Sequence, residues 1–144
     1  MAGTSPLGGY LVAQTATFSV TAAQAETANG VLGTIYVPNN AIIHDVILDV
    51  VAVIDSGAGS TLDVGDASGP TTPDDDRFIA AFSGQAADSI RATEASGTLV
   101  DTVYQYVQAA ATKQNEQAIQ ITNKVVAATG AAGTLRLTVI YHTP

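Results

Sequence analysis

Hydrophobic and polar residues alternate along most of the chain with a period of two residues. In the segment TATFSVTA, for example, Phe18 and Val20 alternate with threonine and serine. This is the period of a half-buried β-strand, because successive side chains of a strand point to opposite faces of the sheet. Eight segments have this character, with Gly, Pro or Asn turns between many of them: residues 15–22, 31–38, 41–55, 60–66, 77–84, 98–110, 117–125 and 134–144.

The strongest strand is predicted over residues 41–55, AIIHDVILDVVAVID. Its density of β-branched residues argues against a helix, in which Val and Ile lose rotamer freedom. We expect a central strand whose core face is nearly all apolar. That face carries His44, Val46, Leu48, Val50, Ala52 and Ile54.

Two segments between the predicted strands are interpreted as loops. Residues 66–76 form the longest irregular stretch, which is built of turn-forming residues and ends in three Asp residues. Residues 85–97 are rich in Ser, Thr and Gly and are also expected to be a loop. No stretch predicts a helix of ten residues or more. The pattern of short strands and turns therefore indicates an all-β sandwich or barrel.

Residues 1–14, MAGTSPLGGYLVAQ, have no period, and Gly8 and Gly9 make this segment costly to order. We interpret the segment as an extended N-terminal arm that docks on a neighbouring molecule, with a frayed tail as the alternative. Residues 15–144 then form the β-sandwich domain. The arm's apolar side chains are the candidate interface: Leu7, Tyr10, Leu11 and Val12.

Composition and charge restrict the partners. Charged residues make up only 12% of the chain, against about 25% in an ordinary globular protein. A surface with so little charge is poorly protected against association, which suggests a subunit of an assembly. The 13 acidic and 5 basic residues give a net charge of −8, which argues against binding to nucleic acid or to anionic membranes.

The chain has no cysteine and no uninterrupted apolar stretch of about 20 residues. Disulfides and thiolate zinc sites are therefore excluded. Met1 to Tyr10 lack the basic start and apolar run of a signal peptide. We expect synthesis and folding in a cytoplasm.

No motif for catalysis or for a cofactor is found. The two histidines, His44 and His142, have no nucleophile motif such as G-x-S-x-G near them. Phosphate-binding glycine loops are missing, and tryptophan, a common sugar platform, is absent. The acids Asp63, Asp66, Asp74, Asp75 and Asp76 surround one loop, but they match only a fragment of a Ca²⁺-binding pattern. We expect a solvated acidic loop, no catalytic residue, no cofactor and no metal site, in a protein that binds other protein surfaces.

Residues 37–84 resemble small structural proteins of tailed bacteriophages, in which a P-x-x-A-x-I-x-D-V strand start leads to a TLDVGD strand and an acidic loop that closes on D-R-[FY]-I. The closing strand, LRLTVIYHT, also resembles the ends of such chains. The matching positions are Pro38, Ala41, Ile43, Asp45 and Val46, then residues 61–66 and 76–79.

This resemblance implies a head decoration (cement) protein of the capsid surface. The expected fold is a single antiparallel β-sandwich, jelly-roll-like, with about eight strands. The expected partner is the major capsid protein, and the expected assembly is a homotrimer where capsomers meet. The motif marks strands, so it transfers no functional residue. A neck, tail or fibre-base component is the alternative, followed by a carbohydrate- or surface-binding module.

Overall fold

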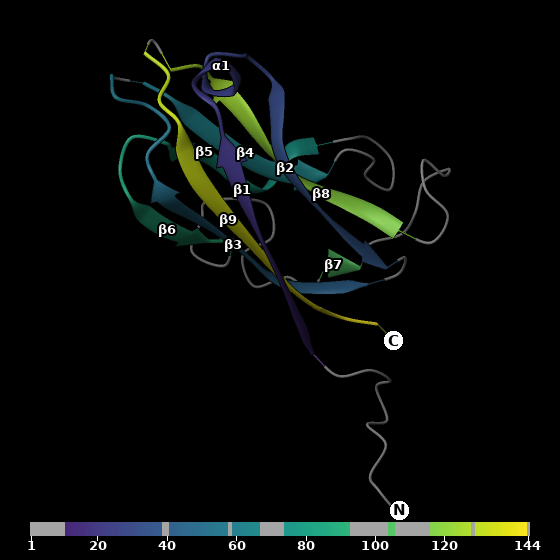
Figure 1. Cartoon of the computed structure of the whole chain (residues 1–144). Coiled ribbons are helices and arrows are strands. Elements are labelled where there is room, and N and C mark those ends of the chain that lie inside the picture. The colour runs from purple at the N-terminus through teal and green to yellow at the C-terminus, as the bar shows by residue number, and fades with distance from the viewer. Residues whose placement is uncertain are drawn as a thin grey trace, which may run out of the picture.

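The computed structural model of the chain describes residues 11–38, 41–57, 59–66, 74–92, 104–105, 116–127 and 129–143. Within these residues there are nine strands and one short helix (Figure 1). Their bounds are β1 Val12–Val20, α1 Ala22–Ala25, β2 Gly30–Pro38, β3 Ile42–Ala52, β4 Thr61–Asp66, β5 Asp74–Ser83, β6 Asp88–Arg91, β7 Tyr104–Gln105, β8 Glu116–Val125 and β9 Gly133–His142.

The strands form two sheets that face each other. Sheet A has the order β1-β9-β3-β6, with β7 also paired to β3, and sheet B has the order β2-β8-β4-β5. All of these pairings are antiparallel. The chain crosses repeatedly from one sheet to the other, although the consecutive strands β4 and β5 are neighbours in sheet B. The predicted antiparallel β-sandwich is confirmed.

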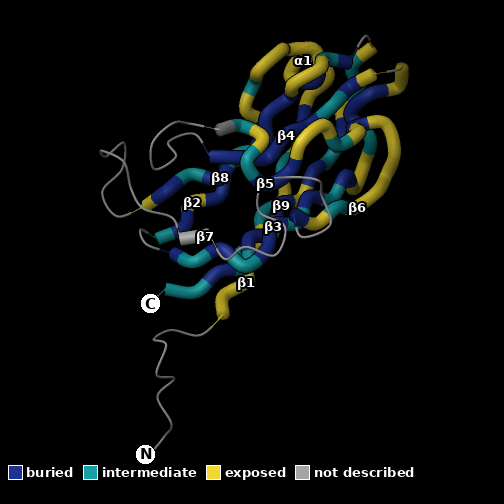
Figure 2. Tube along the Cα trace, turned by 180° about the vertical axis from the view of Figure 1, so that it is seen from behind, coloured by how far each residue is buried: buried dark blue, intermediate teal, exposed yellow. Residues whose placement is uncertain are grey.

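The core fills the space between the two sheets, as the buried strand centres in Figure 2 show. Sheet A contributes Val46, Leu48 and Val50 from β3, each at most 2% exposed, and sheet B contributes the fully buried Ile119 and Ile121 from β8. The predicted core face of β3 is confirmed for these three residues. Alternation of burial in β9 is also regular, with every second residue from Gly133 to Tyr141 buried.

Two bulges in β3 change the predicted faces at its ends. The register of β3 against β9 shifts between Ile43 and Asp45 and again between Val50 and Ala52. A bulge places two residues opposite one, so the side chains beyond it exchange faces. His44 and Ala52 were predicted on the core face, and this is wrong: His44 is half-buried and Ala52 is exposed.

Other element boundaries also differ from the predicted ones. Residues 88–91, predicted as loop, form β6, which pairs with residues 47–50 of β3. Strand β5 includes the three Asp residues that were assigned to the preceding loop, and β1 begins at Val12 instead of Thr15. Of the predicted strand 98–110, only β7 lies within the described residues.

Helix α1 is tied to sheet B by one buried side chain. The fully buried Asn123 of β8 donates from Nδ2 to the carbonyl oxygens of Ala25 at 2.7 Å and Thr27 at 3.2 Å. These carbonyls end a short helix and would otherwise lack partners. At its other end, Thr21 and Gln24 form a capping box. The turn between β1 and β2 is therefore fixed at both ends.

We predict that Leu48→Ala lowers the free energy of unfolding by about 2–5 kcal/mol, because the fully buried side chain leaves a cavity between the sheets. Val51→Ala on the same strand is the control, because Val51 is 50% exposed and should cost less than about 1 kcal/mol. Urea unfolding of both variants checks the prediction. Equal losses in the two variants would contradict the placement of Leu48 in the core.

Candidate protein interface

Charge is distributed unevenly over the strands. Strands β1, VAQTATFSV, and β2, GVLGTIYVP, contain no charged residue. Strand β9 contains Arg136 but no acidic residue. In contrast, β5 begins with three consecutive Asp residues and β6 begins with Asp88. The acidic residues that give the chain its net charge of −8 are thus excluded from β1, β2 and β9.

The two uncharged strands lie on one side of the sandwich. Strand β1 is the edge of sheet A, and β2 is the edge of sheet B; the two contact each other (Figure 1). Their contact is close, since a Cβ atom at Gly33 would lie 2.5 Å from the Phe18 ring. We name residues 11–20 and 30–38 the uncharged edge. The opposite side is formed by β5 and β6, which also contact each other.

Most of the exposed large apolar side chains in the described part of the chain lie on the uncharged edge. Six large apolar residues are exposed in the described part of the chain, and four of them lie on this edge. Those four are Leu11 (64% exposed), Val12 (42%), Val31 (48%) and Tyr36 (39%). Exposed apolar residues that gather in one region mark protein interaction sites more often than scattered ones do. The uncharged edge is therefore the candidate interface.

Strand β1 also offers backbone hydrogen-bonding groups. Its nine residues pair with β9 without a register shift, and among the described strands none pairs with its other side. Natural edge strands are usually protected by charge, proline or a bulge. Strand β1 has none of these, whereas β2 has a register shift between Val31 and Gly33 and ends at Pro38. An extended segment of another chain could add to β1 as a further strand.

The predicted interface residues are described only in part. Leu11 and Val12 are exposed at the start of β1, on the uncharged edge. Leu7 and Tyr10 lie outside the described residues. Val31 and Tyr36 were not predicted, because in the sequence they look like ordinary outward positions of a half-buried strand.

The acidic residues are more ordered than predicted. Asp66 was expected in a solvated loop, and this is wrong: it is 2% exposed and pairs with Arg77. Residues 67–73 of that loop lie outside the described residues. Asp75 pairs with Lys124 at 2.6 Å. The hydrogen bond to Asp75 and the negative charge of Asp75 raise the pKa of Lys124. These acids form ion pairs within sheet B.

Asp63 differs from these acids, because its carboxylate is buried and no Lys or Arg among the described residues forms an ion pair with it. Its Oδ1 atom accepts a hydrogen bond from the Ala81 backbone N–H at 2.7 Å. Burial raises the pKa of Asp63, the Ala81 hydrogen bond opposes this, and the charge of Asp75 adds to the rise. Ala81 has a positive φ of 54°, which fits the irregular register of β5 against β4.

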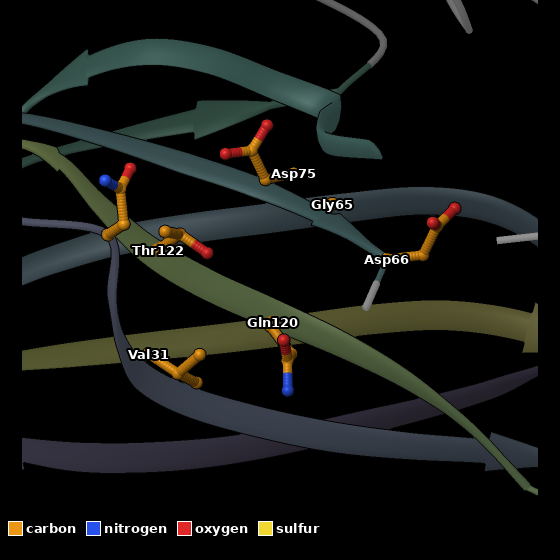
Figure 3. A pocket seen from close by; sticks show the side chains of 7 residues that line it. Val31, Gly65, Asp66, Asp75, Gln120 and Thr122 are labelled. Carbon is orange, nitrogen blue, oxygen red and sulfur yellow. The ribbon is translucent and has the colours of Figure 1, made fainter. Parts of the chain in front are cut away.

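A hollow of about 460 Å³ lies on the outer surface of sheet B (Figure 3). Its carboxylates, Asp66 and Asp75, are already paired with Arg77 and Lys124. Its other lining residues are Asn29, Val31, Gly65, Gln120 and Thr122. This composition does not indicate a particular ligand.

The described residues contain no group of three or more His, Cys, Asp or Glu residues that could hold a metal ion. Within the same part of the chain, no helix is long and apolar enough to cross a membrane.

No protein-family model matches the sequence, and neither does any curated protein. Solved phage capsids do contain chains of similar fold. A chain of the Ralstonia phage GP4 capsid is 27% identical with a TM-score of 0.66, and the match covers all of this chain and 91% of that one. A chain of the cyanophage Pam1 capsid asymmetric unit is 22% identical, with a TM-score of 0.61 and coverage of 100% and 92%.

A chain of the acidic stable capsid of Helicobacter pylori bacteriophage KHP30 is 12% identical, with a TM-score of 0.53 and coverage of 94% of both chains. At these identities the Pam1 and KHP30 matches show the fold alone. The GP4 match, at 27% identity over the whole chain, supports a structural protein of a phage virion. The resemblance to structural proteins of tailed phages is thus supported at the level of a virion structural protein.

We predict that Asp63→Asn is at least as stable as the wild type at about pH 7. The amide removes a buried charge, and its oxygen still accepts the Ala81 hydrogen bond. Since the folded pKa of Asp63 is raised, its protonation stabilises the fold, and this contribution is lost as the pH rises through the folded pKa. The advantage of the variant should therefore shrink as the pH falls toward about 4.

Urea unfolding at both pH values measures this effect, with the exposed Asp88→Asn as the control. A loss of more than about 1 kcal/mol in Asp63→Asn at neutral pH would show that the fold needs the charged carboxylate. That result would also contradict the expectation that no cation binds there.

Proposed function

We propose that this protein is a capsid decoration (cement) protein, which binds the major capsid protein on the outside of a phage head and stabilises the lattice. The observation that carries the proposal is the uncharged edge, with its four exposed apolar side chains. The 27% identity to a chain of the Ralstonia phage GP4 capsid supports it. That chain is nearly as short as this one, since the match covers 91% of it.

The strand order also supports a role in a capsid. The sequence of crossings between sheet A and sheet B follows the connectivity of a jelly roll, which is used in viral capsids and also in lectins. The lectin alternative is weaker, because Tyr36 is the only aromatic residue among the exposed large apolar side chains of the described chain. A sugar site generally needs several aromatic platforms.

The proposed mechanism is thermodynamic linkage. A protein that binds the assembled lattice, but not its free subunits, stabilises the lattice by mass action. Each contact can be weak if the decoration protein is a homotrimer, because three linked sites multiply the affinity through effective concentration. The uncharged edge faces the shell in this arrangement, and the acidic side formed by β5 and β6 faces solvent.

The proposed N-terminal arm extends the same contact. Leu11 and Val12 are exposed where the chain enters β1; Tyr10 comes directly before them in the sequence, and Leu7 three residues earlier. An arm that leaves the sandwich at this point could continue the apolar contact along a neighbouring subunit. A neck, tail or fibre-base protein could use the same surface, so the location of binding on the particle distinguishes these alternatives.

We predict that a negative charge on the uncharged edge weakens binding to undecorated capsids by at least about tenfold, because the buried charge would lack a partner. Val31→Glu tests this, and Val51→Glu and Val125→Glu are matched controls. The three valines are 48%, 50% and 50% exposed, but only Val31 lies on the uncharged edge. Co-sedimentation with capsids measures the affinity.

Mass photometry of the same proteins reports whether the free or bound unit is a trimer. Wild-type binding to tails but not to heads would refute a decoration role. Equal binding by Val31→Glu and the two control variants would show that the contact lies on another surface.

The arm is tested separately by deleting residues 2–10. All of β1 remains in this variant, so its melting temperature should stay close to that of the full chain. Capsid binding should weaken by at least about tenfold if Leu7 and Tyr10 are buried against a neighbour, since each large apolar side chain contributes about 1.5–3 kcal/mol on full burial. Unchanged binding would mean that the arm is a tail without a role in attachment.

A further inference from the structure

The chain has only two histidines, and the fold places them in contact. His44 lies near the start of β3 and His142 at the end of β9, two neighbouring strands of sheet A. The Nε2 atom of His44 is 2.6 Å from the Nδ1 atom of His142. Their ring centroids are 4.8 Å apart and their planes differ by 30°. Neither ring is needed for the core, because the apolar core is formed by other residues.

The contact depends on the first bulge in β3. His142 follows the buried Tyr141 and is paired with Ile42, so it points to the outer face of sheet A. A regular strand would place His44 on the core face together with Val46. The register shift between Ile43 and Asp45 instead turns His44 toward His142. Bulges commonly redirect a side chain in this way, often beside a functional site.

We propose that His44 and His142 bind one divalent transition-metal ion of the Zn²⁺, Ni²⁺ and Cu²⁺ class. Neutral imidazole nitrogens are preferred ligands of these ions. Without metal, one proton lies between the two nitrogens, since only one of them can donate. When the ion binds, the donating histidine shifts that proton to its other ring nitrogen, so both ligands are neutral imidazoles and no net proton is released. Two bonds of about 2.0–2.1 Å to one ion require the nitrogens to separate to roughly 3 Å.

The protein supplies two ligands, and the remaining positions are open to water or to a partner's side chain. The nearby Asp45 is engaged, because its Oδ2 accepts from Arg91 at 2.9 Å and its Oδ1 from the Val46 backbone N–H at 2.9 Å. With no oxygen-rich ligand set among the described residues, the hard ions Mg²⁺ and Ca²⁺ do not suit the site.

Occupancy of the site would join β9 to β3. These two strands pair with all the other strands of sheet A. An ion that binds only the folded state therefore stabilises the whole domain. The site also lies near the uncharged edge, because Tyr141, the residue before His142, is paired with Val12. A ligand from a bound partner could therefore complete the coordination shell.

The experiment measures thermal unfolding of the full chain, without an affinity tag, in the presence of Ni²⁺ or Zn²⁺. The expected rise in melting temperature is about 3–5 °C at a metal concentration near five times the Kd. His44→Gln and His142→Gln should each abolish this rise, while Asp75→Asn, which removes an acid far from the pair, should keep it. Mg²⁺ should have no effect on any of these proteins.

A second readout does not depend on the stability of the variants. Paramagnetic Ni²⁺ should broaden the NMR signals of both imidazole rings in the wild-type protein before it broadens other signals. The proposal is overturned if Ni²⁺ and Zn²⁺ leave the wild type unchanged, or if both His variants keep the full rise in melting temperature. Neither result would affect the proposed role in capsid binding, which is measured on particles.

Discussion

The pairing of β3 with β9 is the contact on which the rest of the structure depends. It joins the middle of the chain to its last described strand, and it carries three buried cross-strand pairs: Val46 with Val139, Leu48 with Leu137 and Val50 with Leu135. On the outer face, Arg136 of β9 binds Asp49 of β3 at 2.9 Å. Strand β1 belongs to sheet A only through β9. The β1 part of the uncharged edge therefore depends on a contact that is distant in sequence.

Polar residues with buried hydrogen bonds fix the conformation of several turns that connect the strands. Asn123 fixes the end of α1 on β8. Asp55 accepts backbone hydrogen bonds from Gly57 at 2.8 Å and Ser60 at 3.1 Å; the Gly57 bond in particular lowers the pKa of its carboxyl group. Turns held in this way keep the strand ends in fixed positions. A surface presented by a fixed frame loses less conformational entropy on binding than a flexible one.

The sequence pattern was sufficient for the sandwich and for most faces of the central strands, because alternation with a period of two follows directly from strand geometry. It could not locate the bulges at His44 and Val51, since an extra residue in a strand leaves no trace in an apolar run. It also missed β6, whose four residues owe their conformation to pairing with β3 and not to their own preferences. Leu11 was predicted as an interface residue because it lacks a periodic partner, and the structure shows that it is exposed. Val31 and Tyr36 could be recognised only once the sheet order placed β2 at an edge beside β1.

The separation of charge between the two sides of the sandwich has a physical consequence for assembly. A contact made through charged residues must remove water from each charge, and this cost can equal the gain from pairing. The uncharged edge avoids that cost and gains from apolar burial and from the open backbone groups of β1. The acidic residues on the far side keep a chain of low charge soluble and discourage contacts there. In the proposed decoration role, the uncharged edge would face the capsid and the Asp-rich starts of β5 and β6 would point away from it, which would disfavour further layers of the protein on itself.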